Sequence, residues 1–220
     1  ILKNLLAFFG VSDTIVQDNL ANEIITEFSS VEEIKSNYIY QSYIEDVHSE
    51  TYSRLIDHLI KDEDEKQSMF KALSNNVAVK AKKWLDNGDI IQRVVAFSLL
   101  EGMGFSSTFA VLMFFRLRYP QLAGLGQANE LILSDEVLHM HFGIKLHNSY
   151  IKKEYQLEPS AIKEMILDCY ETEVVFVESI YGTNYVLGLP KDKLIQYIQY
   201  VTDSLLIYYN LETVFKVEQP

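Results

Sequence analysis

Two Glu-x-x-His pairs are the residues of this chain whose types and spacing could do chemistry. Glu45 stands three residues before His48, and Glu136 stands three residues before His139. Residues three apart lie on the same face of a helix, so each pair offers a carboxylate and an imidazole to a common point. One such pair arises by chance in many helices, whereas two in apolar helical surroundings indicate a metal site.

Two isolated acids, Asp13 and Glu101, complete this set. Each lies on an otherwise apolar helical face, where a lone carboxylate must be paired, protonated or bound to a metal. One carboxylate from each of two helices, with Glu-x-x-His from each of two others, is the di-iron site of ferritin-like bundles. Four carboxylates balance two divalent cations, and oxygen-rich ligation with two imidazoles suits iron or manganese better than zinc or copper. The alternative is that core hydrogen bonds satisfy each acid and histidine separately, although buried acids are rarely tolerated without partners.

Helices must position these residues, and apolar residues recur at intervals of three and four along the whole chain. Glycine and proline are scarce, with 9 and 4 residues, and no alternating strand of convincing length is present. The pattern predicts seven or eight helices, with clear positions at about 5–20, 38–59, 63–87, 90–119 and 124–153, and from Pro159 and Pro190 onward. We therefore expect an all-α, ferritin-like helical bundle with a di-metal carboxylate site in its core. Residues 1–220 would form a single domain, the ordered core of a longer chain that lacks its N-terminal segment and C-terminal tail.

One segment, residues 94–115, is long and apolar enough to span a bilayer. It contains a single charged residue, Glu101. A carboxylate at mid-membrane costs roughly 2.5–3.5 kcal/mol, with Asp as the guide. The neighbouring helices are amphipathic, which suits packing around one central buried helix. We therefore expect a core helix and no membrane partner.

Composition excludes several classes of protein. The chain is 48% hydrophobic and 12% aromatic, which excludes a disordered chain. Its 31 acidic residues outnumber its 19 basic ones, for a net charge of −12, so the surface repels nucleic acid. The single cysteine, Cys169, excludes an internal disulfide, a cysteine-based zinc site and a cysteine-ligated iron–sulfur cluster. A reducing compartment, most simply the cytosol, is expected.

Five stretches resemble, in order, the small, radical-generating subunit of class I ribonucleotide reductase: LLAFFGVSD, YIEDVHSETYSRLI, RVVAFSLLEGMGFSSTFA, NELILSDEVLHMHF and YIQYVTDSLL. The resemblance covers essentially the whole chain. It implies two iron ions per chain that react with dioxygen, giving an oxo-bridged di-iron centre and a tyrosyl radical. The oxidising equivalent then passes to a large catalytic subunit, which reduces ribonucleotides to deoxyribonucleotides. Manganese, alone or mixed with iron, shares these ligands.

The resemblance also implies roles for individual residues. Six positions match metal ligands, with Glu45 and Glu136 bridging: Asp13, Glu45 and His48 for one metal, and Glu101, Glu136 and His139 for the other. Tyr52 matches the radical-bearing tyrosine, and its place four residues after His48 puts both on one helix face; a tyrosine satisfied in the core is the alternative. Three positions match the apolar lining of the radical pocket: Phe105, Phe109 and Ile132. Asp135 matches the acid that accepts a hydrogen bond from His48 and begins the radical-transfer route.

The family implies a homodimer that docks on the large subunit in the cytoplasm, which would be the host cytoplasm for a viral member. Two positions depart from the family pattern. Ser134 stands where an arginine usually precedes the Asp-Glu pair, and Ser204 stands where an arginine follows Asp in the late helix. The alternatives are another ferritin-like di-iron oxidase, such as a desaturase or a ligand-binding oxidase, and non-enzymatic iron storage. Asp13, where those proteins typically use Glu, and Tyr52 argue against both.

Overall fold

The computed structural model describes residues 2, 5, 6, 8, 9, 24–67, 88–182 and 185–219, and these residues contain helices and no strand. The predicted all-α class is therefore confirmed. The chain divides into two compact units, Ile1–Arg93 and Val94–Pro220. The expectation of a single domain stays a prediction.

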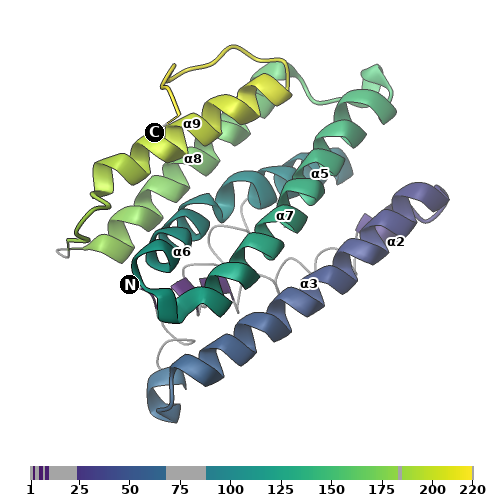
Figure 1. The fold of residues 1–220 in the computed structure, drawn as a ribbon. Coiled ribbons are helices and arrows are strands. Elements are labelled where there is room, and N and C mark those ends of the chain that lie inside the picture. Colours follow the sequence, from purple (N-terminus) through teal and green to yellow (C-terminus); the bar gives the residue numbers. More distant parts are fainter. Residues whose placement is uncertain are drawn as a thin grey trace. The chain divides into compact units, whose positions relative to one another are not determined.

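One long helix, α3 (Glu32–Leu59), dominates the first unit (Figure 1), and a single turn, α2 (Ile25–Glu27), precedes it. Glu32 and Glu33 lie in the first turn of α3, where negative charge is favourable to the helix dipole. Its buried residues recur every three or four positions and form one stripe: Tyr38, Gln41, Glu45, His48, Tyr52 and Ile56. The predicted helix over 38–59 is confirmed, and its buried stripe contains the predicted ligands and tyrosine.

A nearly continuous helix starts at Ile90 and lies mostly in the second unit. It consists of α5 (Ile90–Leu99), a π-helix, η2 (Leu100–Gly104), and α6 (Ser106–Arg118). Within the described part of the chain, Ile90–Arg118 is the one helical stretch long and apolar enough to cross a bilayer, with a mean hydropathy of 1.5. However, 78% of the apolar 18-residue segment within this helix is buried inside the protein, as expected of a core helix.

The predicted helix over 90–119 is present as Ile90–Arg118, but it is not regular between Leu100 and Phe105. There the π-helix adds a residue to the turn, and Phe105 departs from helical geometry with φ −114° and ψ −5°. A Cβ atom on Gly102 would come within 2.5 Å of Met140 Sδ, so the missing side chain allows this turn to approach α7 closely. The apolar pattern cannot reveal the π-helix because this helix is apolar on every face.

Three further helices surround the π-helix: α7 (Ala123–Lys145), α8 (Pro159–Tyr181) and α9 (Lys191–Tyr208). Figure 1 shows α8 and α9 side by side, in agreement with their extensive contacts. Pro159 opens α8 at its first position, and Pro190 directly precedes α9; proline suits these places because its missing N–H would have no partner within the helix. The remaining short segments are η3 (Pro120–Leu122), η4 (Leu146–Tyr150) and η5 (Lys153–Tyr155).

A buried carboxylate on α9 holds the segment that follows this helix. Asp203 accepts hydrogen bonds from three successive backbone N–H groups, those of Val214 (2.8 Å), Phe215 (3.1 Å) and Lys216 (2.6 Å). Lys216 has a positive φ of 54°, a conformation that costs a residue other than glycine about 1 kcal/mol or more. The three hydrogen bonds offset this cost and give Asp203 a structural role.

Candidate metal centre

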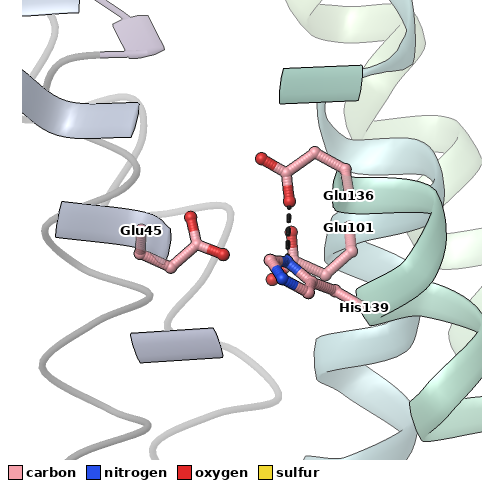
Figure 2. Close-up of side chains that lie close together, drawn as sticks. All are labelled: Glu45, Glu101, Glu136 and His139. Carbon is pink, nitrogen blue, oxygen red and sulfur yellow. Dashed lines mark hydrogen bonds and ion pairs between the residues drawn. The ribbon is translucent and has the colours of Figure 1, made fainter. Parts of the chain in front are cut away.

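Three predicted ligands meet inside the second unit. Glu101 comes from the π-helix η2, and Glu136 and His139 come from α7 (Figure 2). One ligand atom from each lies within 4.8 Å of the ligand atoms of the other two. The relative exposures of the three residues are 4%, 1% and 9%. Glu136 and His139 lie 35 and 38 residues after Glu101 in the chain. The fold therefore brings together two carboxylates and an imidazole from distant positions.

The donor chemistry of this cluster fits iron or manganese. In Figure 2 a dashed line joins His139 Nδ1 to Glu136 Oε2, which are 3.1 Å apart. Because an ionised carboxylate only accepts, this contact places a proton on Nδ1 in the metal-free form. Two carboxylates so close together in a buried site repel each other, and a divalent cation between them would remove that repulsion. Oxygen and imidazole ligands suit these hard to intermediate cations.

The first unit repeats the same local arrangement. His48 Nδ1 lies 3.3 Å from Glu45 Oε2 on α3, and both side chains are buried. Figure 2 also draws Glu45 on its helix. Both Glu-x-x-His motifs therefore form the intrahelical carboxylate–imidazole contact that their spacing predicts. Asp13, the sixth predicted ligand, lies outside the described residues.

Tyr52 lies one turn after His48 on α3 and is fully buried. Its ring stacks on the ring of Phe9, with centroids 4.5 Å apart and planes inclined by 2°. Phe8 in turn meets Phe9 edge to face at 5.9 Å. Sequence reasoning assigned no role to Phe9. The available signal was its position four residues before Asp13 in the stretch LLAFFGVSD, which places both on one face of a regular helix.

The other predicted residues all belong to the second unit. Phe105, Phe109 and Ile132 are buried, and Asp135 is half-buried beside Glu136. Asn129 Nδ2 donates to the carbonyl oxygen of Phe109 at 3.4 Å and links α7 to α6. Tyr52 belongs to the first unit, so the roles of these residues toward it stay predictions.

The two serines that depart from the family pattern are satisfied within their own helices. Ser134 Oγ donates to the carbonyl of Glu130, and Ser204 Oγ donates to the carbonyl of Tyr200, each at 2.9 Å. A serine in this geometry bonds to the preceding turn of its own helix. Each of these two hydrogen bonds stays within one helix, whereas the longer side chain of an arginine could extend to a neighbouring element.

The fold and this cluster define a ferritin-like helical protein with a buried Glu/His cluster that could hold a metal ion. All 220 residues, 1–220, match the family model described as "Ribonucleotide reductase, small chain". The chain therefore belongs to the ribonucleotide reductase small-chain family.

Individual relatives agree with this assignment. The chain is 34% identical to the ribonucleoside-diphosphate reductase small subunit of Dictyostelium discoideum, over all of this chain and 65% of that protein. It is 37% identical to the small chain of Encephalitozoon cuniculi, over all of this chain and 67% of that protein. The solved structure of the ribonucleotide reductase Rnr4 homodimer from Saccharomyces cerevisiae matches with a TM-score of 0.80 and 27% identity, covering 99% of this chain and 69% of that one. The chain thus spans about two thirds of the length of these relatives.

Proposed function

We propose that this chain is the metal-binding core of a ribonucleoside-diphosphate reductase small subunit, which forms a tyrosyl radical at Tyr52. A large catalytic subunit would use the oxidising equivalent to reduce ribonucleotides to deoxyribonucleotides. The observation that carries the proposal is the buried convergence of Glu101, Glu136 and His139 in a chain that belongs to this family. Core acids with purely structural roles have no reason to gather around one point with an imidazole.

The proposed centre holds two metal ions. Glu101, Glu136 and His139 would bind one ion. Asp13, Glu45 and His48 would bind the other, with Glu45 and Glu136 bridging. The matching Glu-x-x-His contacts of α3 and α7 support this assignment, because each presents the same pair of donors.

When bound, two iron ions, or manganese in place of one or both, would use dioxygen to supply a one-electron oxidation. Tyr52 would lose one electron and its phenolic proton. The Phe9 ring covers one face of the Tyr52 ring at 4.5 Å and would exclude water and reductants from that face. Phe105, Phe109 and Ile132 would complete this dry pocket, and Asp135 would accept a hydrogen bond from His48 and start the route toward the large subunit.

The proposed partners are a second copy of the chain and the large subunit. The homodimer is supported by the Saccharomyces cerevisiae relative, whose structure is described as a homodimer. The large subunit, dioxygen and a cytoplasmic location are inferred from the family.

Substitution of a single hydroxyl tests the proposal. The full chain is loaded anaerobically with Fe(II), exposed to air, and examined by metal analysis and electron paramagnetic resonance. The parent should bind two metals and give a tyrosyl signal. Tyr52→Phe keeps the stacked ring and loses at most one hydrogen bond, about 0.5–1.5 kcal/mol, so it should bind both metals and give no tyrosyl signal.

Tyr43→Phe provides the matched control, because Tyr43 lies on the same helix and is exposed. This variant should retain both the metals and the signal. A parent without metal binding would contradict the proposed centre. A Tyr52→Phe variant with an undiminished tyrosyl signal would place the radical on another residue.

A further inference from the structure

A buried glutamate on α8 contacts the helix that carries Glu101. Glu173 is 1% exposed. Its Oε1 accepts a hydrogen bond from the backbone N–H of Ser107 at 3.2 Å, and the Ser107 hydroxyl donates to the same oxygen. Burial of a carboxylate is costly unless hydrogen bonds compensate it. This contact joins residues 66 positions apart and ties α8 to α6.

Ser107 occupies a special place in its helix. It is the second residue of α6, and the π-helix η2 ends three residues earlier at Gly104. The first N–H groups of an α-helix have no acceptor within that helix, and a carboxylate at this end is favoured by the helix dipole. Glu173 therefore caps α6 from a neighbouring helix, in the middle of a stretch that is otherwise one continuous helix.

The cap affects the position of Glu101 because Ser107, the residue that is capped, lies where α-helical hydrogen bonding resumes after the π-helix. Each residue added to a helical turn rotates the side chains before it by about 100° relative to those after it. Glu101 lies inside η2, so its direction depends on the π-helix being kept. A regular α-helix through this stretch would turn Glu101 away from Glu136 and His139.

We propose that Glu173 is a positioning residue for the metal centre: by capping α6 at Ser107 it maintains the π-helix that directs Glu101 toward Glu136 and His139. The inference rests on the proposed function, since it treats Glu101 as a ligand. Glu173 itself does not contact the metal in this scheme. Its effect is transmitted through the backbone of residues 100–107.

The test measures Mn(II) binding and amide hydrogen exchange on the full chain. Free Mn(II) is followed by electron paramagnetic resonance during a titration of the parent, Glu173→Gln and Ser107→Ala. Glu173→Gln removes the charge and weakens the cap, so it should weaken binding of at least one Mn(II) ion by about 10–100-fold, as for other residues that orient metal ligands. Exchange of the amides of residues 105–108 should become faster. Ser107→Ala removes only the hydroxyl bond and should give a smaller effect in the same direction.

Asp203→Asn is the matched control, because Asp203 is also a buried carboxylate that caps backbone N–H groups, at a site formed by α9 and residues 214–216. Its Mn(II) affinity should equal that of the parent. If Glu173→Gln and Ser107→Ala both bind two Mn(II) ions as tightly as the parent does, the inference is overturned, even where exchange is faster. If the parent itself binds no Mn(II), the proposed function is overturned together with the inference. Should Glu173→Gln not fold, the affinity of Ser107→Ala decides.

Discussion

Replacing Glu101 by glutamine decides whether this buried acid is a metal ligand or a hydrogen-bonding group of the core. Ligand oxygens of Glu101 and Glu136 lie within 4.8 Å of each other in a buried site. Two unit charges at that separation repel by about 3.5 kcal/mol at an effective dielectric constant of roughly 20. Glutamine keeps the side-chain volume and removes one charge. Without metal, Glu101→Gln should therefore be at least as stable as the parent, with a gain of up to about 3 kcal/mol.

Added Mn(II) should reverse this order of stability. A ligand that binds only the folded state stabilises it by about 2.7 kcal/mol when its concentration is one hundred times its Kd. The parent should show a stabilisation of this size. The variant lacks a charged ligand, so it should gain much less from the same Mn(II) concentration and become the less stable protein.

Urea denaturation followed by far-UV circular dichroism, with and without Mn(II), measures both effects. Asp203→Asn serves as the control for a structural carboxylate. It weakens hydrogen bonds to a charged group, so it should lower the free energy of unfolding by about 1.5–3 kcal/mol in both conditions. If Glu101→Gln behaved in the same way, with an equal loss with and without metal, Glu101 would be a structural core residue and the metal assignment would be refuted.

Two further predictions concern packing in the second unit. Phe109→Ala should lower the free energy of unfolding by roughly 3–5 kcal/mol and shorten the lifetime of the tyrosyl signal. Phe176 is another buried phenylalanine, and Phe176→Ala should lower stability but leave that lifetime unchanged. Equal lifetimes in both variants would mean that Phe109 only packs in the core. Gly143→Ala should cost about 1–3 kcal/mol by chemical denaturation, because its Cβ would lie 2.9 Å from the Cβ of Ser98, next to the α5 backbone. Gly124→Ala, on the same helix with nothing within 4 Å, should instead stabilise by about 0.4–1 kcal/mol, and a loss there would contradict the steric explanation.

The helical class and the local ligand pairs could be predicted from the sequence because both depend on neighbours along the chain. Apolar residues spaced by three and four predicted α3. The spacing of Glu45, His48 and Tyr52 placed these three residues on one face, which the structure buries. The same rule predicted the contact of Glu136 with His139, which the structure contains at 3.1 Å. Helix starts at Pro159 and after Pro190 could be predicted as well, since proline is restricted by its own ring.

Only the tertiary structure decided how Glu101 is held. Its π-helix interrupts the helix that the sequence predicts over 90–119, and no stripe of polar residues marks the change, because this segment packs against α7, α8 and α9. The cap on Ser107 comes from Glu173, 66 residues away, and Tyr52 stacks on Phe9, which belongs to another segment of the chain. The spacing of apolar residues predicts which face of its own helix a residue occupies. It does not predict which distant residue packs against that face, because such contacts form only when the packed helices exclude water from the space between them.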